Sequence, residues 1–392
     1  MRIAILIVFI LGHGKAYVAH NCAVKTYPEN DDNLKMSEYI INLDSPAESR
    51  WDALVNGRKQ ELLHLFEVFS EIDNEYFKGY LMKFVDKYLN LLDKKIPSPY
   101  REEINGISRE AGLNKGRVIA YNIFYEIFTF CTSILAVDNS SEQNLYHVRN
   151  LDFGLFLGWN SINKTWKISE ALKPLTVALD YRRGNVTIYK AVSFVGYLGV
   201  LTAMKPGKFS LTVNERFTTD GGGFVGILLW LIGCREMNWL SFFTRDLMAN
   251  ALSFQEAREQ LKLAPLIAPV YFIIGGLDKT QANVITRSRM QMVNDRNLSA
   301  WHNSSRAPNW YLLETNYDWW KKPFFVDDRR TPAINCLKYT KQTGTINFST
   351  LYDVLSTQPV LNKLTVYSSL MNVKAGTIET YLRECPNPCP PW

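Results

Sequence analysis

The chain has 392 residues, of which 47% are hydrophobic and 13% aromatic, so it can bury a large core and is not an intrinsically disordered protein. Its 44 basic and 38 acidic side chains leave a formal net charge of +6 at pH 7, without the dense basic tract that is typical of a nucleic-acid-binding protein. We therefore expect one large domain, or two closely packed parts, and no nucleic-acid partner.

The first residues have the pattern of a secretory signal peptide. A basic start at Arg2 precedes an apolar run over 3–11, and the small residues Ala16 and Ala19 follow as candidate cleavage positions. We predict that residues 1–19 are removed during secretion; a buried N-terminal strand is the alternative. No later stretch supplies the ~18 apolar residues of a membrane-spanning helix. The nearest, over 223–233, is too short.

Passage through the secretory pathway also agrees with the sequons and the cysteines. Six N-x-S/T sequons favour a glycoprotein: Asn139, Asn163, Asn185, Asn297, Asn303 and Asn347. Six cysteines are present: Cys22, Cys131, Cys234, Cys336, Cys385 and Cys389. In an oxidising compartment most of them are expected in disulfides, although spacing alone does not give the connectivity. Cys385 and Cys389 are close enough for a local bridge that pins the C-terminal tail.

The N-terminal third is predicted to be helical, because apolar residues recur there at spacings of three and four between Trp51 and Leu92. The stripe consists of Leu62, Leu65, Phe66, Phe69, Ile72, Tyr76, Phe77, Tyr80, Leu81, Phe84, Tyr88 and Leu92. Such a stripe is usually core. Its richness in aromatic residues also fits a membrane-facing or lipid-binding surface, which is the alternative.

After Cys131 the sequence changes to strand-like runs rich in β-branched residues. These runs are CTSILAV, LTVALDY, NVTIYKAVSF, KFSLTVNE, PVYFIIGG, NVITRSR, NWYLLETN and KLTVYSSLM. Helical stretches are expected near 224–250, 254–263 and 328–340. Runs of strands with helices between them predict an α+β fold in which helices cover the sheets.

The change from helical to strand-rich sequence falls at Phe130-Cys131, inside YNIFYEIFTFCTSILAVD, where no flexible linker is present. A boundary without a linker is explained if the chain is cut there. The cut would turn an internal cysteine into a new N-terminus, giving a helical α-chain of residues 20–130 and a catalytic β-chain of residues 131–392.

A cysteine nucleophile needs a base or a cation nearby, because its free pKa of about 8.5 leaves it mostly protonated at acid pH. The histidines are His13, His20, His64, His147 and His302. A papain-like enzyme would use His147 or His302, but the local signature of that family is missing. The α-amino group of Cys131 itself is the other candidate base, as in N-terminal-nucleophile hydrolases. The Cys131 thiol would then release that amine by attacking the Phe130 carbonyl.

Polar motifs follow at several places. HVRNLDFG puts Arg149 and Asp152 just after an expected strand, where they fit a pocket rim near Cys131. Further clusters are LNERF with Asn214 and Glu215, ETNYD with Asn316, and DDRRTPA with Asp327, Asp328, Arg329 and Arg330. Each of these clusters is unremarkable alone.

Together the blocks resemble the acid ceramidase family over about residues 22–392. They are FCTS, HVRNLDFGLFLGWN, LKPLTVALDYRR, SFVGYLGVLTAMKPGKFSLTVNERF, ETNYDWWKKPFFVDDRRTPA, YDVLSTQPVLNKLTVY and YLRECPNPC, with CAVKTYP and INLD near the start. The resemblance implies a helical N-terminal chain plus a four-layer αββα N-terminal-nucleophile hydrolase fold.

Residue by residue, the resemblance implies that Cys131 is both the nucleophile and, with Phe130, the cleavage point. It implies that Asp152 holds the free α-amine and that Arg149 orients the substrate and supports the thiolate. Asn316 would donate a hydrogen bond to the oxyanion, and Glu215 and Arg329 would complete the polar shell. It further implies disulfides Cys22–Cys336 and Cys385–Cys389, which leave Cys234 single as an inert thiol.

The activity implied is lysosomal hydrolysis of the ceramide amide bond to sphingosine and a fatty acid. A related acid amidase that cleaves N-acylethanolamines shares the catalytic blocks and is the alternative; LDFGLFLGWN, NERF and CPNPC lean towards ceramide. A non-catalytic lipid carrier is a remote third interpretation. The expected partners are ceramide, an anionic lipid vesicle surface and, from the family alone, a saposin-type activator. Neither a metal site nor an organic cofactor is expected.

Overall fold

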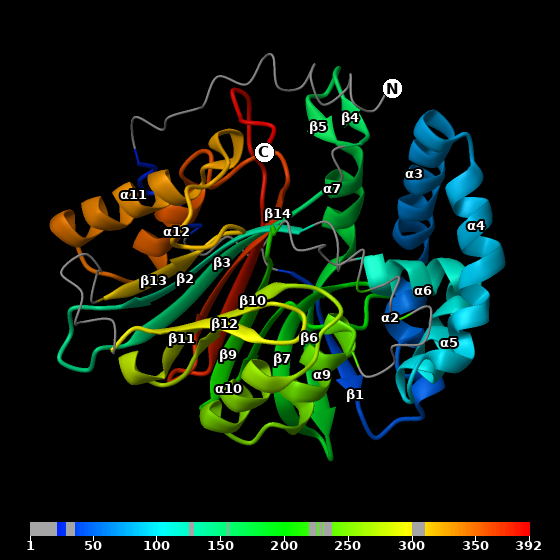
Figure 1. Ribbon diagram of the computed structural model, residues 1–392, viewed down its shortest axis with the longest axis horizontal. Coiled ribbons are helices and arrows are strands. Elements are labelled where there is room, and N and C mark those ends of the chain that lie inside the picture. Colours follow the sequence, from blue (N-terminus) through cyan, green and yellow to red (C-terminus); the bar gives the residue numbers. More distant parts are fainter. Residues whose placement is uncertain are drawn as a thin grey trace.

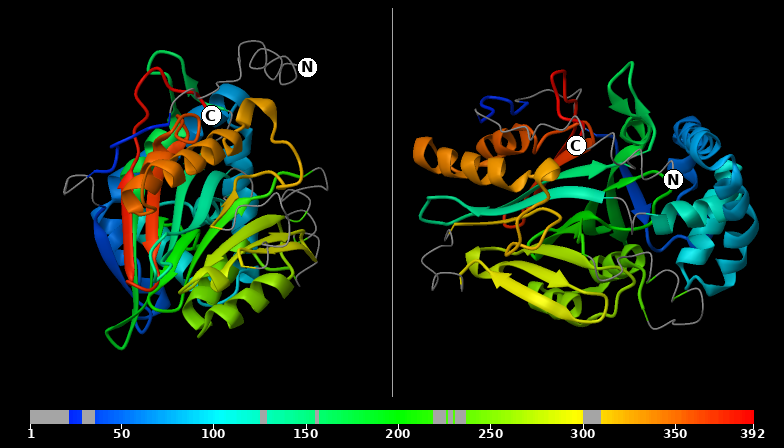
Figure 2. Two further views of the ribbon diagram at one scale, coloured as in Figure 1. Left: turned by 90° about the vertical axis from the view of Figure 1, so that its left-hand side faces the viewer. Right: turned by 45° about the horizontal axis from the view of Figure 1, so that its top comes forward.

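The computed structural model describes residues 22–28, 36–124, 129–154, 157–218, 226, 230, 237–299 and 310–392. Two β-sheets pack face to face, and helices cover the outer face of each (Figures 1 and 2). This order of layers, helix, sheet, sheet and helix, confirms the predicted α+β fold of the αββα type. None of the described helices is both long and apolar enough to cross a bilayer. The predicted signal peptide, Cys234 and the sequon at Asn303 lie outside the described residues.

An eight-stranded sheet forms one inner layer, with the strand order β1-β6-β7-β8-β9-β10-β11-β12. Its strands are β1 (Glu38–Asn42), β6 (Thr176–Arg183), β7 (Val186–Phe194), β8 (Thr202–Lys205), β9 (Phe209–Glu215), β10 (Val270–Gly275), β11 (Ala282–Arg287) and β12 (Met292–Asn297). β1 pairs with β6 in parallel, whereas the other pairs in this sheet are antiparallel. A strand from the N-terminal third therefore completes the edge of the large sheet.

A five-stranded antiparallel sheet forms the second inner layer, in the order β13-β2-β3-β14-β15. Its strands are β13 (Tyr311–Glu314), β2 (Thr129–Val137), β3 (Leu145–Phe153), β14 (Thr365–Asn372) and β15 (Thr377–Leu382). A small hairpin of β4 (Trp159–Asn160) and β5 (Thr165–Trp166) lies apart from both sheets. β2 begins at Thr129, two residues before Cys131.

Helices cover both outer faces of the sandwich (Figure 1). They are α11 (Arg330–Thr343) and α12 (Phe348–Ser356) on the smaller sheet, and α9 (Leu240–Asn250) and α10 (Phe254–Leu263) on the larger one; α7 (Lys167–Leu172) follows the hairpin. Successive side chains of a strand point to opposite faces, so the residues of β2 contribute alternately to two parts of the core. Ile134 packs with Leu337 and Leu355 under the helices. Leu135 packs with Ile273 between the sheets.

The N-terminal helices form a group at one end of the sandwich, at the right of Figure 1. They are α2 (Asp52–Gly57), α3 (Lys59–Phe77), α4 (Tyr80–Tyr88), α5 (Tyr100–Ala111) and α6 (Lys115–Phe124). The apolar stripe predicted across them divides into two parts. Leu62, Leu65 and Phe66 on α3 are buried in the main core. Tyr80 on α4 and Leu91 just after it are each 69% exposed, so this end of the stripe is a surface.

A buried ion-pair cluster holds the N-terminal helices to the rest of the protein. Glu103 on α5 is fully buried and accepts hydrogen bonds from Arg50 and from Arg245 on α9, each at 2.8 Å. Trp51 donates to the same carboxylate at 2.7 Å. Because the cations outweigh burial, the pKa of Glu103 is lowered and the cluster stays charged. The N-terminal helices and the β-sandwich therefore share an interface that does not depend on the covalent chain between them.

Two disulfides are present, with the pairing that the family resemblance implies. Cys22–Cys336 joins the N-terminal segment to α11, and Cys385–Cys389 closes a short loop near the C-terminus. Cys131 is the free cysteine among the described residues. The Cys22–Cys336 bridge would keep the two chains linked after a cut before Cys131.

The described sequons differ in accessibility. Asn139, Asn163 and Asn185 are exposed, whereas Asn297 and Asn347 are half-buried. The amide nitrogen of Asn297, the atom to which a glycan would be attached, already donates to the Thr280 carbonyl and to Asn283, both at 2.9 Å. The three exposed sequons are therefore the better glycosylation candidates.

Candidate active site

Cys131 is the third residue of β2 and is completely buried. Its side chain points between the two sheets, and its sulfur lies 3.8 Å from the Val213 carbonyl on β9 and 2.6 Å from Nη2 of Arg149. Burial raises the pKa of the Cys131 thiol, while the positive charge of Arg149 opposes that rise. In the intact chain the sulfur is therefore held as a thiol, beside a cation that would stabilise the thiolate.

Arg149 is fixed from both sheets. It lies on β3 opposite Ser133 of β2, and its guanidinium donates to the Leu201 carbonyl at 2.6 Å, to Thr202 Oγ1 at 2.9 Å and to the Val213 carbonyl at 3.2 Å. Its side chain is 0% exposed. These carbonyls compensate the buried charge and hold the guanidinium on the sulfur of Cys131.

Asp152 lies on the opposite face of β3, since it is three residues after Arg149 in the same strand. Both residues were expected just after a strand at a pocket rim. That expectation is wrong, because both lie within β3 and are fully buried. Asp152 pairs with Phe130 across β2 and β3, so its carboxyl lies beside the Phe130–Cys131 peptide and not beside the thiol side chain. The backbone N–H of Asp152 does point to the sulfur.

The carboxyl of Asp152 is only partly satisfied. Its Oδ2 accepts from Nη1 of Arg329 at 3.1 Å, whereas Oδ1 is buried without a partner in hydrogen-bond geometry among the described residues. Burial raises the pKa of Asp152 to about 6, and the charge of Arg329 opposes the rise. The side chains of Thr365 and Asn362 also lower this pKa through hydrogen bonding. The group therefore changes its charge between neutral and acid pH.

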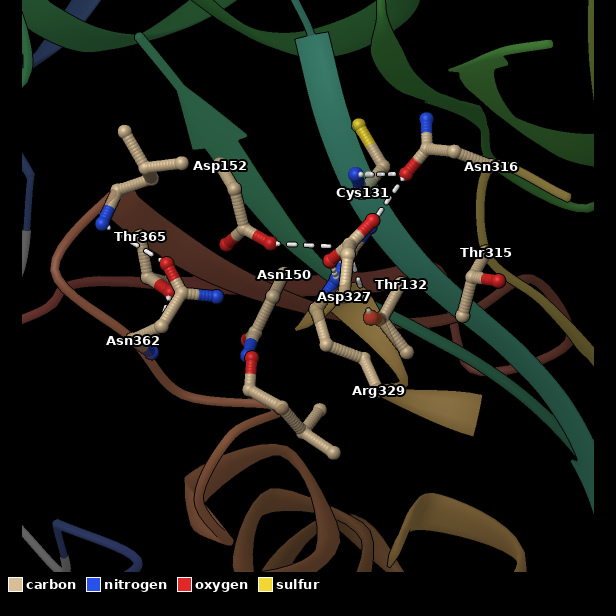
Figure 3. Close-up of polar contacts among 12 residues, drawn as sticks. Cys131, Thr132, Asn150, Asp152, Thr315, Asn316, Asp327, Arg329, Asn362 and Thr365 are labelled. Carbon is tan, nitrogen blue, oxygen red and sulfur yellow. Dashed lines mark hydrogen bonds and ion pairs between the residues drawn. The ribbon is translucent and has the colours of Figure 1, made fainter. Parts of the chain in front are cut away.

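Arg329, at the N-terminus of α11, connects the polar groups on this side of the sheet (Figure 3). It pairs with Asp327 at 2.7 and 3.1 Å, with Asp152 at 3.1 Å, and it donates to Asn316 Oδ1 at 2.7 Å. Burial would lower its pKa, but the charges of Asp327 and Asp152 outweigh burial and raise it. The guanidinium also lies 5.7 Å from the Phe130 ring centroid. One cation thus lies against both Phe130 and the polar groups around it.

Asn316 follows β13 and contacts the main chain of Cys131. Its Oδ1 accepts from the Cys131 N–H at 2.9 Å, and its Nδ2 donates to the Glu215 carbonyl at 2.8 Å. In Figure 3 the amide nitrogen of Asn316 points to the side on which the Cys131 sulfur lies. The main-chain oxygen of Glu215 thus joins the site, and a role of its side chain in the polar shell stays a prediction.

Two motifs that looked unremarkable singly run side by side and bridge the two sheets. The side chain of Asn214 donates to the Glu314 and Thr315 carbonyls at 3.1 and 3.0 Å, and the Phe217 N–H donates to the Asn316 carbonyl at 3.0 Å. Arg216 forms a bidentate pair with Asp318 at 2.7 and 3.0 Å. These bonds connect LNERF, at the end of β9, to ETNYD, at the end of β13, and so fix Asn316 against Cys131.

We expect Asp318→Asn to lower kcat about tenfold to a hundredfold with little change in KM. Loss of the Arg216 pair would let Asn316 move by a fraction of an ångström, and misplacement of about 1 Å can cost 10²-fold. Steady-state kinetics on the cleaved protein will measure this. Asp295→Asn on β12, which loses a more exposed pair with Arg258 of α10, is the control. An Asp318 variant with unchanged kcat would show that the pair does not position Asn316.

His147 does not act as the base for Cys131. It lies on β3 opposite Leu135, and its two ring nitrogens are hydrogen-bonded to Ser210 Oγ at 2.8 Å and Thr212 Oγ1 at 2.9 Å. Burial and the charge of Arg149 lower its pKa to about 3, so the ring stays neutral in weak acid. The other candidate of a Cys–His pair, His302, lies outside the described residues.

Four further residues of the site were not singled out from the sequence as site residues. Asp327 pairs with Arg329, Thr132 lies 3.4 Å from the same guanidinium, and Thr202 links Arg149 to the Tyr367 hydroxyl, which is 2.8 Å away. Asp327 stands two residues before Arg329 in the DDRR block, and this closeness in the sequence could have predicted that the two side chains pair. Thr132, Thr202 and Tyr367 lie in ordinary strand sequence and give none. No group of three or more potential metal ligands occurs in the described part of the chain.

Comparison with known proteins agrees with this geometry. The profile of the linear amide C–N hydrolases, choloylglycine hydrolase family, matches residues 131–384, and that of the beta subunit of N-acylethanolamine-hydrolyzing acid amidase matches residues 35–96. Acid ceramidases of Homo sapiens and Mus musculus are 46% and 45% identical over 95% of this chain and 93% of their own. A solved Caenorhabditis elegans N-acylethanolamine-hydrolyzing acid amidase ortholog is 31% identical, with a TM-score of 0.52, over 65% of this chain and 100% of its own. The chain therefore belongs to the choloylglycine hydrolase family of linear amide C–N hydrolases, within which it is similar to the acid ceramidases.

Proposed function

We propose that this protein hydrolyses the amide bond of ceramide to sphingosine and a free fatty acid after cutting its own chain between Phe130 and Cys131. The observation that carries the proposal is the buried Cys131 thiol on Arg149, in a chain 46% identical to an acid ceramidase over 95% of its length. The site holds a thiol, a guanidinium, a carboxyl and an amide group together. A lipid carrier without catalytic activity would not need this set, so its presence argues against that function.

The cut is an acyl shift from nitrogen to sulfur. The Cys131 sulfur attacks the Phe130 carbonyl carbon, a C–S bond forms, and the C–N bond breaks while the nitrogen takes up a proton. Water then hydrolyses the thioester, which leaves a carboxyl group on Phe130 and a free thiol and amine on Cys131. Two separate family profiles, one over 35–96 and one that begins at residue 131, support a subunit boundary at this position.

After the cut, Cys131 would supply both the nucleophile and the base. Its α-amine would accept the thiol proton, and the unsatisfied Oδ1 of Asp152 would hold that amine. Arg149, at 2.6 Å, would stabilise the thiolate and orient the substrate. Asn316 would donate to the oxyanion of the tetrahedral intermediate, a contribution of about 2.7 to 4 kcal/mol for one donor. Arg329 keeps Asp152 and Asn316 in place.

Activation should accelerate as the pH falls through about 6, the pKa of Asp152 in the uncut chain. Below this pH the carboxyl is protonated and can give its proton to the departing Cys131 nitrogen. Above it, the carboxylate can give none, and its charge further raises the pKa of the thiol. The cleaved fraction on reducing gels, followed over time across a pH series that brackets 6, will measure the rate. Asp152→Asn should cleave slowly and without the step near pH 6; a step of unchanged position in that variant would assign the titration to another group.

Ceramide and N-acylethanolamines are to be compared on the same preparation. Protein incubated at acid pH should yield a new N-terminus at Cys131, and the two chains should separate on a denaturing gel only after reduction, because of Cys22–Cys336. We expect kcat/KM for long-chain ceramide to exceed that for N-palmitoylethanolamine roughly tenfold or more. The reverse order would favour an acid amidase for N-acylethanolamines. A protein that stays in one piece and hydrolyses neither would be a carrier.

The expected setting is the lysosome, reached through the ER as a glycosylated precursor. The working form would be a disulfide-linked heterodimer of residues 20–130 and 131–392 that acts on ceramide in anionic vesicles, assisted by a saposin-type activator. The exposed end of the N-terminal apolar stripe supports contact with lipid, because Tyr80 and Tyr88 lie there with Lys83 and Lys87 over their rings. Aromatic and lysine side chains together are typical of segments that lie on a membrane surface.

A further inference from the structure

The segment between β7 and β8 carries one of the groups that hold Arg149. We call residues 195–201 the β7–β8 loop. The carbonyl of Leu201, its last residue, accepts from Nη1 of Arg149 at 2.6 Å and from the Val213 N–H at 3.0 Å. Nη2 of the same guanidinium lies 2.6 Å from the Cys131 sulfur. The position of this loop therefore helps to set where the cation lies relative to the nucleophile.

The β7–β8 loop packs against the N-terminal helices. A Cβ atom on Gly196 would lie 3.6 Å from Leu62 on α3 and from Ile107 on α5. The ring of Tyr197 contacts the ring of Tyr121 on α6 edge-on, at 6.1 Å between centroids. The side chains of the loop are buried: Val195, Tyr197, Leu198, Val200 and Leu201. The loop thus takes its position from a surface that the N-terminal third provides.

Asn122 on α6 connects this surface to the backbone of the loop. Its Nδ2 donates to the Gly196 carbonyl at 3.0 Å, and its Oδ1 accepts from the Leu198 N–H at 2.7 Å. Nδ2 also donates to the Val118 carbonyl at 3.0 Å, one turn earlier in α6, which fixes the orientation of the amide. The side chain is 0% exposed. Because hydrogen bonds are directional, two bonds from one buried amide define the place of the loop more closely than apolar packing does.

We propose that Asn122 is a positioning residue for the reaction: through the β7–β8 loop and its Leu201 carbonyl, it keeps the guanidinium of Arg149 on the Cys131 sulfur. Asn122 lies nine residues before Cys131, so a cut at Phe130–Cys131 would leave it in the N-terminal chain. That chain would then contribute to the chemistry of the other chain without touching the substrate. This inference rests on the proposed function for the reaction, although the ionisation of the thiol can be measured without any substrate.

Asn122→Leu tests this role, because leucine has nearly the same volume and makes none of the three hydrogen bonds. The Gly196 carbonyl and the Leu198 N–H would lose this partner, and the loop would move to find others. With Arg149 farther from the sulfur, the thiolate fraction of Cys131 at a given pH should fall about tenfold. The ultraviolet absorbance of the thiolate, taken as the difference from Cys131→Ala, measures this fraction. The kcat for ceramide should fall to a similar degree.

Two further substitutions of Asn122 separate hydrogen bonding from packing. At acid pH the protonated carboxyl of Asn122→Asp can donate to the Gly196 carbonyl and accept from the Leu198 N–H, so kcat should return to within about twofold of the wild-type value. Asn122→Ser fills less space and reaches one of the two loop groups. It is the milder variant should leucine prevent folding, and it should lower the thiolate fraction and kcat about threefold.

Asn283→Leu is the matched control. Asn283 on β11 is also 0% exposed, and its side chain is hydrogen-bonded to Asp295 at 2.7 Å and to Asn297 at 2.9 Å. Its loss should lower the free energy of unfolding, as that of Asn122 should, but leave the thiolate fraction of Cys131 unchanged. Denaturant unfolding of both variants gives the comparison.

Wild-type thiolate fraction and kcat in the folded leucine or serine variant would overturn the proposal. An equal loss in Asn283→Leu would also overturn it, since the effect would then be ordinary destabilisation. A kcat that Asn122→Asp fails to recover at acid pH would assign the effect to the packing of α6, with the same consequence. A protein whose thiolate depends on Asn122 but that cleaves no ceramide would leave the positioning role standing and refute the proposed substrate.

Discussion

Replacing Cys131 by alanine is expected to leave the chain uncut at acid pH and to lower amide hydrolysis by about 10⁴-fold or more. The loss would be so large because, in the proposed mechanism, one residue is the cleavage point, the attacking sulfur and the carrier of the base. The thiol is buried 2.6 Å from Arg149, and no histidine in the described part of the chain contacts it. Reducing gels will follow the cut, and release of fatty acid from ceramide will follow hydrolysis.

Cys131→Ser separates the role of the sulfur from that of its surroundings. A hydroxyl is a poorer nucleophile than a thiol at acid pH but can make the same acyl shift, so this variant should cut slowly and incompletely. Ser133→Ala, two residues along the same face of β2, loses a buried hydrogen bond to Asn214 but keeps the sulfur, so it is the control for disturbance of the strand and should still be cut. Cleavage of the alanine variant at Phe130–Cys131 would mean that another group cuts the chain, and hydrolysis by that variant would remove Cys131 from the mechanism.

Arg329→Met is expected to lower the free energy of unfolding by about 3 to 5 kcal/mol, the usual cost of removing one partner of a buried ion pair. The substitution would leave both Asp327 and Asp152 in the protein interior without their cation, and it would remove the 2.7 Å hydrogen bond that holds Asn316. Denaturant unfolding of the uncut chain will measure the effect. Cleavage should also become slower.

A matched control is available in Arg117, which forms a bidentate pair with Asp86 at 2.7 and 2.8 Å on the surface of the N-terminal helices. Both side chains are about a third exposed, so Arg117→Met should cost no more than about 1 kcal/mol. Adding Asp152→Asn to Arg329→Met should restore part of the stability, because one uncompensated charge is removed. An equal loss of unfolding free energy in the two methionine variants would show that the Arg329 cluster contributes no more to stability than a surface ion pair.

The layered fold and most long strands could be predicted from the sequence, because β-branched runs such as NVTIYKAVSF are unambiguous and because the helix over 254–263 has a clear apolar period. Short elements were not predicted. β1 and β8 have four or five residues each, and their strand character depends on pairing with neighbours in the sheet and not on local preference. Distant pairing of this kind leaves no local pattern in one sequence.

The candidate site was predictable where a residue type carries its own chemistry or belongs to a family block, as for Cys131 and Asn316. The geometry was not. Arg149 and Asp152 are three positions apart, which puts them on one face of a helix but on opposite faces of a strand. Only the strand assignment places Arg149 at the thiol and Asp152 at the Phe130–Cys131 peptide. Hydroxyl partners such as Thr202 have no signal at all, since threonine is common in strands.

The parallel strand β1 has a consequence for how this protein must be made. It comes from the N-terminal third, yet it pairs with β6 and forms the edge of the large sheet, with Ile41 buried. Without β1, the edge of β6 would present unpaired N–H and C=O groups that pair readily with another copy. The N-terminal third therefore protects the large sheet from pairing with a second copy. We expect residues 131–392 produced alone to aggregate, and any cut before Cys131 would have to follow folding for the sheet edge to stay covered.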